Sequence, residues 1–309
     1  MNYRSVADLN RIIAQQWVVL PTGFDLLVGI PRSGMLAASI LSLYTQLPCV
    51  DVYALLDGRI HDPAFRAANS LPASIRKILV VDDSIASGSS MKKIKAELGL
   101  LSAGYQFQYC AIYSIPGKRG SADFVFEQVP LPRYFQWNIF NHTMLEKACF
   151  DIDGVLCADP LPEQNDDGER YIDFLRHAMP LYLPGSPMGT LVTSRLEKYR
   201  SYTVEWLRKQ GLNYKKLVMM DLPDMKARQQ ANNHASYKAE VYKNPVYNLF
   251  VESSFRQAVE INRITGKPVF CTENFAMIYN RRSLLYDIKS GRIFPFLRAA
   301  ALKIRTWRS

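Results

Sequence analysis

An acidic pair in the first half of the chain has residue types suited to binding a sugar phosphate. Asp82 and Asp83 follow the apolar run Ile78–Val81 and precede a stretch of small residues, namely Ala86, Ser87, Gly88, Ser89 and Ser90. Small side chains let backbone N–H groups approach a phosphate, a following helix adds its positive dipole, and serine hydroxyls donate further hydrogen bonds. Carboxylates beside such a cradle suit the vicinal hydroxyls of a ribose, with Mg²⁺ nearby. The plainer interpretation is a strand, a loop and a helix with an acidic cap.

A second acidic pair, Asp151 and Asp153, ends the apolar stretch Cys149–Phe150 as a D-x-D-G sequence closed by Gly154. Carboxylates at alternate positions past a strand end can face one point, and the glycine permits a sharp turn beyond them. One carboxylate can act as nucleophile in phosphoryl transfer while the other serves as acid and base. Two close carboxylates also repel each other, so they favour Mg²⁺ between them.

The segment Ile78–Ser90 resembles the signature with which type I phosphoribosyltransferases bind phosphoribosyl diphosphate (PRPP), and the resemblance spans roughly residues 20–140. It implies that Asp82 and Asp83 hold the ribose hydroxyls and that Ala86–Ser90 binds the 5′-phosphate. It also implies displacement of diphosphate from ribose C1 by a nitrogenous base. Such a reaction is helped mainly by positioning and by stabilising the departing charge.

The upstream sequence Val28–Gly34 fits the diphosphate loop of the same family. Its glycines have the spacing of a nucleotide-binding P-loop, but Met35 follows where that motif needs lysine, so the nucleoside-triphosphate interpretation fails. Backbone amides around Arg32, Ser33 and Gly34, together with the Arg32 side chain, would cradle the diphosphate.

Two further features of this half concern substrate contacts. Arg59 and His61 lie between the two loops and are candidates for contacting the diphosphate, although exposed loops often carry these residue types. Trp137 lies where the family builds base recognition, and it could stack on a base or belong to a small core. The base itself cannot be named from the sequence.

The D-x-D-G sequence resembles the first motif of haloacid-dehalogenase-like (HAD) phosphatases, and three more motifs follow in order over residues 147–272. The resemblance implies that Asp151 is the nucleophile and that Asp153 marks a phosphatase. In the second motif, Leu191–Arg195, it implies that Thr193 holds the transferring phosphoryl group.

The third and fourth motifs supply charge. Lys238 would neutralise the nucleophile and the phosphate, although Lys243 competes for this role. Glu252 would complete a Mg²⁺ site with the two aspartates, while Ser253 stands where a second acid is common in the family. The short segment between the first two motifs implies a minimal cap.

Expected strands and helices alternate along the chain, which argues for mostly parallel sheets covered on both faces. In the first half, a capping box at Ser5 opens a helix through Gln16, followed by strands at Phe24–Ile30, Ile78–Val81 and Gln108–Ser114 and helices at Met35–Tyr44 and Ser90–Leu98. In the second half, strands are expected at Lys147–Phe150, Met188–Val192, Leu217–Met220, Leu249–Val251 and Pro268–Cys271, with helices at Tyr171–Ala178 and Glu197–Lys209.

The predicted fold class is therefore α/β, with two doubly wound domains that each contain a mostly parallel sheet. Residues 1–140 would form a phosphoribosyltransferase-like domain, and residues 147–280 a HAD-like Rossmannoid domain with a minimal cap. Residues 281–309 would form a basic amphipathic extension.

The composition is that of an ordinary globular protein, with 48% hydrophobic and 21% charged residues. The five cysteines are scattered and never form C-x-x-C, so neither a disulfide framework nor zinc is expected. Reduced thiols, no signal peptide and no apolar run of membrane-spanning length predict a cytoplasmic protein without a membrane span.

The net charge of +10 is concentrated at the C-terminal end, where residues 281–309 hold eight basic residues and one acidic residue, a net of +7. A solvated amphipathic helix is the plainer interpretation of this segment. Contact with something anionic is the alternative, whether nucleic acid, an acidic lipid surface or a phosphorylated substrate. A homodimer contact is a further use for it.

These features together predict a bifunctional enzyme of nucleotide or modified-nucleoside metabolism. The first domain would transfer phosphoribosyl from PRPP to a nucleobase-like acceptor, and the second would hydrolyse a phosphomonoester through an aspartyl-phosphate, both with Mg²⁺. One alternative is a first domain that senses PRPP or nucleotide, or binds RNA, and thereby regulates the phosphatase. Another is a phosphatase of nucleic-acid ends, which the basic extension would serve.

Overall fold

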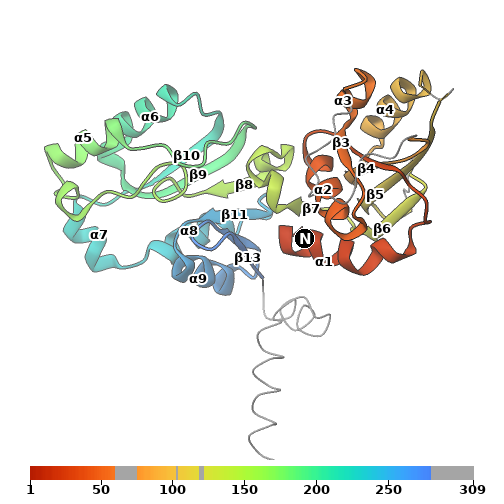
Figure 1. Ribbon diagram of the computed structural model, residues 1–309. Coiled ribbons are helices and arrows are strands. Elements are labelled where there is room, and N and C mark those ends of the chain that lie inside the picture. The colour runs from red at the N-terminus through yellow and green to blue at the C-terminus, as the bar shows by residue number, and fades with distance from the viewer. Residues whose placement is uncertain (60–74, 102–103, 118–121, 280–309) are drawn as a thin grey trace, which may run out of the picture. The chain divides into compact units, whose positions relative to one another are not determined.

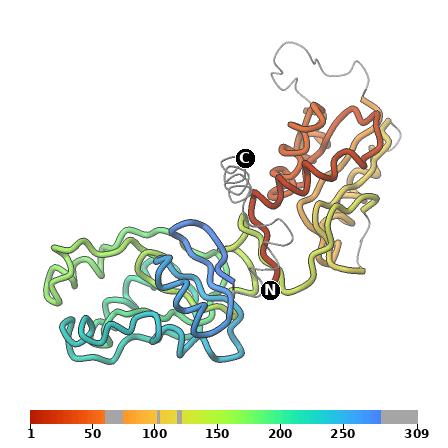
Figure 2. The backbone as a smooth tube through the Cα atoms, turned by 90° about the horizontal axis from the view of Figure 1, so that it is seen from below, coloured from red at the N-terminus to blue at the C-terminus, as the bar shows by residue number. Residues whose placement is uncertain are grey.

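The structure is a computed structural model, and it describes residues 1–59, 75–101, 104–117 and 122–279 of the 309-residue chain. The chain divides into two compact units, the first from Met1 to Trp137 and the second from Asn138 onward. Each unit is built from one continuous stretch of chain (Figure 2). The predicted roles of His61 and of the basic extension 281–309 lie outside the described residues.

The first unit contains a sheet of five parallel strands in the order β3-β2-β4-β5-β6 (Figure 1). These strands are β2 (Leu26–Gly29), β3 (Cys49–Asp51), β4 (Lys77–Ile85), β5 (Gln106–Ser114) and β6 (Phe124–Gln128). A separate parallel pair joins β1 (Asn2–Arg4) to β7 (Arg133–Phe135).

Helices cover both faces of this sheet. Alternate strand residues point to opposite sides, so each face presents apolar side chains that the helices bury. The helices are α1 (Val6–Gln16), α2 (Ser33–Thr45), α3 (Val52–Leu56) and α4 (Ser89–Gly99), with a 3₁₀ turn η1 (Trp17–Val19). Leu9 of α1 and Leu41 of α2 pack with Leu79 in one core cluster. Val52 of α3 and Ile94 of α4 pack with Val80 in the other.

The capping box predicted at the start of the first helix is present. The Ser5 hydroxyl accepts from the Asp8 backbone N–H at 3.1 Å, and the Asp8 carboxylate accepts from the Ser5 N–H at 2.9 Å. Both contacts satisfy backbone donors that have no partner within the helix.

Strand β4 is longer than the sequence predicts. The predicted strand ends at Val81, whereas β4 continues to Ile85 and includes the acidic pair Asp82–Asp83. The extension arises because β5 pairs with β4 as far as Ile85, while β2 ends opposite Val81. Asp82 and Asp83 therefore lie within β4, alongside β5 but beyond the end of β2.

The second unit contains a sheet of six strands in the order β10-β9-β8-β11-β12-β13, in which only β13 is antiparallel. The strands are β8 (Ala148–Phe150), β9 (Met188–Leu196), β10 (Tyr214–Met220), β11 (Leu249–Glu252), β12 (Val269–Cys271) and β13 (Ala276–Ile278). The predicted α/β class with two mostly parallel sheets is thus confirmed.

Helices and short turns connect these strands. The helices are α5 (Glu169–His177), α6 (Arg200–Lys209), α7 (Met225–Ala231), α8 (His234–Tyr242) and α9 (Phe255–Thr265). The 3₁₀ turns are η2 (Gln136–Asn141), η3 (Thr143–Lys147), η4 (Pro162–Gln164) and η5 (Glu197–Tyr199). Ala239 of α8 and Ala258 of α9 pack against Phe250 of β11 in the core.

Further details of the second unit differ from the sequence prediction. Strand β9 runs on to Leu196, so Thr193 lies within the strand and not after it, because Leu196 still pairs with Met220 of β10. The helix predicted at Glu197–Lys209 begins with the separate turn η5. Strand β13 and the helices α7, α8 and α9 have no counterpart among the predicted elements. Among the described residues, no helix is long and apolar enough to cross a membrane.

A close backbone approach fixes the start of β9. A Cβ on Gly189 would lie 2.5 Å from the Ala148 carbonyl oxygen and 2.8 Å from that of Glu146. We expect Gly189→Ala to lower the free energy of unfolding of the second unit by about 1–3 kcal/mol, since backbone must shift. The control is Gly168→Ala, whose Cβ would meet its nearest neighbour at 3.5 Å. Urea denaturation of both variants decides the matter, and equal midpoints would contradict this packing argument.

Candidate functional site

The first unit brings the predicted diphosphate loop and the predicted ribose carboxylates into contact. The Ser33 hydroxyl, at the start of α2, donates to Oδ1 of Asp83 at 2.7 Å. The indole N–H of Trp137 donates to Oδ2 of the same carboxylate at 2.9 Å. Trp137 also stacks on Phe135, with ring centroids 4.9 Å apart. Its side chain therefore positions Asp83, a role that the sequence did not suggest.

Asp82 is almost fully buried beside the start of α2. Its Oδ1 accepts from the backbone N–H of Asp83 at 2.9 Å. A Cβ on Gly34 would lie 2.8 Å from the Val81 carbonyl oxygen and 3.2 Å from the Asp82 carboxylate, so glycine is what lets the helix approach the strand. Burial, followed by the charge of Asp83, raises the pKa of Asp82 to about 8. No lysine or arginine of the described residues forms an ion pair with either carboxylate.

The loop after β4 leads directly into α4, as the phosphate-cradle interpretation requires. Gly88 has a φ of +80° and caps α4, a left-handed conformation that favours glycine. The hydroxyls of Ser87 and Ser89 lie 2.8 Å apart. Ala86 and Ser90 are exposed, as are the two bonded serines. The exposed loop at a helix N-terminus can present N–H and O–H donors to an anion.

The arginines predicted to meet the diphosphate occupy different settings. Arg32 is exposed and precedes α2. Arg59 forms an exposed ion pair with Asp57 at 2.6 Å, which leaves its contact with a ligand a prediction.

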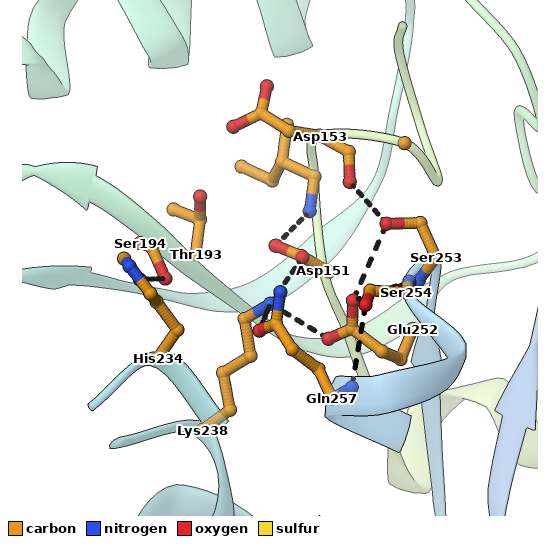
Figure 3. Close-up of polar contacts among 12 residues, drawn as sticks. Asp151, Asp153, Thr193, Ser194, His234, Lys238, Glu252, Ser253, Ser254 and Gln257 are labelled. Carbon is orange, nitrogen blue, oxygen red and sulfur yellow. Dashed lines mark hydrogen bonds and ion pairs between the residues drawn. The ribbon is translucent and has the colours of Figure 1, made fainter. Parts of the chain in front are cut away.

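The second unit brings the predicted nucleophile, the predicted lysine and the fourth-motif acid together (Figure 3). Lys238 of α8 donates to Asp151 at 2.5 Å, to Glu252 at 2.8 Å and to the side-chain oxygen of Gln257 at 3.0 Å. Asp151 follows β8 and Glu252 ends β11. These parallel neighbours present their carboxyl ends at one edge of the sheet, where ligands of such folds bind.

The charges of this group shift one another's protonation. Burial raises the pKa of Asp151 to about 7, although the ammonium of Lys238 opposes the shift. Burial alone would lower the pKa of Lys238, but Asp151 and Glu252 outweigh it and hold that pKa above its ordinary value. The alternative lysine, Lys243, is exposed and bonds to Glu240 at 2.5 Å, so it takes no part in this group.

Asp153 has a partner that the sequence did not reveal. Its carboxylate accepts from Nη2 of Arg195 at 2.6 Å and from Nε at 3.1 and 3.2 Å. Arg195 is fully buried, and it also bonds to Thr203 and to the Cys157 sulfur. Burial would lower the pKa of Arg195, yet Asp153 outweighs it and raises that pKa. A buried arginine nearly always needs an acidic partner. An arginine at the end of the apolar second motif could therefore have predicted that Arg195 pairs with a nearby carboxylate.

The three predicted magnesium ligands do not surround one open point in this arrangement. Glu252 accepts through Oε1 from the N–H groups of Ser253 and Ser254 at 3.0 and 3.1 Å, and through Oε2 from Lys238. Asp153 is engaged by Arg195. Within the described ranges, no three His, Cys, Asp or Glu side chains are grouped so that they could hold a metal ion. The ligand roles of Asp151, Asp153 and Glu252 stay predictions.

A close contact joins the first and fourth motifs. Gly154 has a φ of +73°, and a Cβ on it would lie 2.4 Å from both Cβ and Oγ of Ser253. The Ser253 hydroxyl donates to the Asp153 carbonyl oxygen at 3.2 Å. The serine at the position where the family often has an acid thus fixes the turn after the nucleophile.

The predicted phosphoryl-binding threonine lies beside the nucleophile, as Figure 3 shows. Thr193 is fully buried, and its Oγ1 accepts from the Arg195 N–H at 3.2 Å. The next residue, Ser194, bonds through Oγ to Nδ1 of His234 at 2.9 Å. His234 had no role in the sequence analysis. Its position one turn before Lys238 on α8 is the signal that could have found it, since such residues share a helix face.

A pocket of about 700 Å³ opens above this group. Its lining joins the four motifs to residues from α7 and from the segment before α5, and includes Asp151, Asp153, Ser194, His234, Lys238, Ser253, Gln257, Asp159, Asn165 and Arg228. Such a volume accommodates a phosphate and part of its leaving group.

No family model matches the sequence, and no curated protein matches it. Solved structures do match part of the chain. A xanthine-guanine-hypoxanthine phosphoribosyltransferase from Helicobacter pylori is 18% identical, with a TM-score of 0.34, over 45% of this chain and 92% of that one. A purine phosphoribosyltransferase from Pyrococcus horikoshii Ot3 is 16% identical, with a TM-score of 0.33, over 44% of this chain and 92% of that one. A hypothetical protein from Neisseria gonorrhoeae with bound ppGpp is 16% identical, with a TM-score of 0.33, over 44% of this chain and 88% of that one.

Proposed function

We propose that the second unit hydrolyses phosphomonoesters through a covalent intermediate on Asp151. The observation that carries this proposal is the buried contact of Lys238 with Asp151 and Glu252 at the floor of the pocket. An Asp151 oxygen attacks phosphorus, the bond from phosphorus to the leaving oxygen breaks, and water then hydrolyses the acyl phosphate. Thr193 and Lys238 are the groups that contact the transferring phosphate in this proposal.

We infer that the first unit binds PRPP and transfers its phosphoribosyl group to a nucleobase-like acceptor. Asp82 and Asp83 accept hydrogen bonds from the ribose hydroxyls, and Ala86–Ser90 binds the 5′-phosphate. The link from Ser33 to Asp83 supports this proposal, because it joins the diphosphate loop to the ribose carboxylates. Mg²⁺ fits this first site, since buried carboxylates that form no ion pair within the described part of the chain suit it, and it would neutralise diphosphate.

The two proposed activities would act in sequence, with phosphoribosyl transfer first and phosphate removal second. Transfer from PRPP is reversible, and removal of phosphate from a product would draw the transfer forward. The regulatory alternative makes a different prediction, namely that PRPP is bound but not consumed while the phosphatase rate changes. Following PRPP consumption and phosphate release in the same reaction separates the two.

The nucleophile can be tested without disturbing the first unit. We expect Asp151→Asn to abolish hydrolysis of 4-nitrophenyl phosphate and to leave PRPP affinity unchanged, because the nucleophile belongs to the second unit alone. The control is Asp173→Asn, an exposed carboxylate of α5 outside the pocket lining. Hydrolysis by Asp151→Asn at the wild-type rate would exclude an aspartyl mechanism.

The ribose carboxylates can be tested by calorimetry. We expect Asp82→Asn combined with Asp83→Asn to weaken PRPP binding by roughly 2–4 kcal/mol, since charge-assisted hydrogen bonds are lost. Glu97→Gln, near the far end of α4, serves as the control. Unchanged affinity of the double variant would remove the PRPP assignment from this loop.

The raised pKa of Asp82 predicts a pH dependence of stability. The folded chain keeps a proton on Asp82 up to a pKa of about 8, whereas an unfolded aspartate loses it near the ordinary pKa of 3.8. The stabilising contribution is therefore complete below the lower value and is lost as pH rises through the upper one. We expect Asp82→Asn to exceed the wild type in stability by about 1–3 kcal/mol at pH 9, with the difference shrinking towards pH 4. Denaturation midpoints against pH measure this, and a constant difference would contradict it.

A further inference from the structure

Arg228 of α7 lines the pocket above the proposed nucleophile and has only neutral partners. It is half-buried, and none of the ion pairs among the described residues includes it. Its Nη1 donates to the Ser194 carbonyl oxygen and its Nη2 to Oδ1 of Asn165, each at 3.4 Å. Both distances exceed the roughly 2.9 Å that is usual for such bonds. The guanidinium is thus loosely held, and it has five N–H donors to offer.

The cations around the nucleophile differ from Arg228, because acids compensate them. Lys238 lies between two carboxylates, and Arg195 is bound to Asp153. These two cations are therefore occupied before any ligand enters. Arg228 is the pocket-lining arginine or lysine of the described residues whose charge is left for a ligand.

The turn that precedes α5 contains two acids, and each has its own cation. Asp166 pairs with Arg170 at 3.0 Å, and Asp167 with Lys198 at 2.9 Å. The Asp167 carboxylate also accepts from the first backbone N–H of α7 at 3.1 Å. This contact joins α7 to the turn and fixes the helix that carries Arg228, so less order must be gained when a ligand binds.

Two further acids line the pocket on its other side. Glu273 accepts from the Phe255 N–H at 2.8 Å, just after the fourth motif. A Cβ on Gly154 would lie 2.9 Å from Oδ2 of Asp159, so that carboxylate lies beside the turn after the nucleophile. Arg228, in contrast, bonds to the second motif. The pocket therefore has an acidic side and a basic side.

Tyr171 of α5 adds a hydroxyl to the basic side of the pocket. Burial raises the pKa of Tyr171 to about 12, although the charges of Arg195 and Arg228 oppose the shift. The side chain is therefore a neutral phenol near pH 7, and its O–H can donate to an anion next to the guanidinium.

We propose that Arg228 binds a second anionic group of the substrate, a carboxylate or a further phosphate, apart from the phosphate that is transferred. The inference rests on the phosphatase proposed above, in which Thr193 and Lys238 contact the transferring phosphate. Those two side chains are almost fully buried, whereas Arg228 reaches solvent and lies nearer the mouth of the pocket. The planar fork of a guanidinium matches two oxygens of a carboxylate or phosphate. The substrate class is thus a phosphomonoester that carries a second negative charge.

The test uses matched substrates that differ in the second anionic group. Glycerol 3-phosphate and 3-phosphoglycerate share a carbon skeleton and test a carboxylate. Adenosine 5′-monophosphate and adenosine 3′,5′-bisphosphate test a phosphate. We expect the wild type to favour the more anionic member of at least one pair by about 10–100-fold in kcat/KM, because charge-assisted hydrogen bonds are added. The pair with the larger preference identifies the group that Arg228 binds.

Arg228→Met removes the charge and keeps much of the length of the side chain. We expect the preference within the pair to fall to about 1–3-fold, mainly through KM, and Arg228→Lys to retain part of it. The matched control is Lys226→Met, which removes a charge from an exposed position of the same helix outside the pocket lining. This control should keep the wild-type preference.

Three results would overturn the inference. The first is a wild type that hydrolyses 4-nitrophenyl phosphate but has no preference in either pair, which leaves the phosphatase standing. The second is a folded Arg228→Met protein whose activity falls equally on both members, since Arg228 would then contact the transferring phosphate. The third is an equal loss of preference in Lys226→Met, which would indicate general attraction by the helix. A wild type that releases phosphate from no substrate would instead overturn the phosphatase itself.

Discussion

The buried ammonium of Lys238 lies between two carboxylates that would otherwise repel each other, and the second unit depends on that contact. Removing ions from water costs on the order of several kcal/mol each, and losing one member would leave a buried charge uncompensated. The ends of β8 and β11 and one face of α8 must therefore meet for electrostatic reasons as well as for packing. Gln257 and two backbone amides complete the hydrogen bonds of the group.

The two candidate sites have opposite electrostatic designs. In the second unit, Lys238 and Arg195 are paired with Asp151, Glu252 and Asp153, so two cations offset two of these three acidic charges before a phosphate binds. In the first unit, Asp82 and Asp83 face each other without an ion-pair partner among the described residues, and one of them keeps a proton until about pH 8. Such a pair suits hydroxyl donors or a ligand that carries its own cation.

The sequence was sufficient for the α/β class and for placing the acidic residues of both candidate sites near strand ends, because short apolar runs ending in acids mark the edges of parallel sheets. It was insufficient for strand lengths, since the ends of β4 and β9 depend on how far their neighbours extend. It also missed side-chain partners distant in sequence, such as Arg195 for Asp153 and Trp137 for Asp83. Spacing along one segment carries no information about which side chain of another segment fills a buried hydrogen bond.

The contact between Trp137 and Asp83 also has an optical consequence. Indole emission depends on the charge and hydrogen bonding around its N–H, and this N–H lies 2.9 Å from a carboxylate oxygen of the first site. Trp206, by comparison, is buried in the second unit and donates to a backbone carbonyl. The chain therefore contains its own fluorophore at the first site, whose spectrum should follow any ligand that changes the hydrogen bonds of Asp83, without a dye or a label.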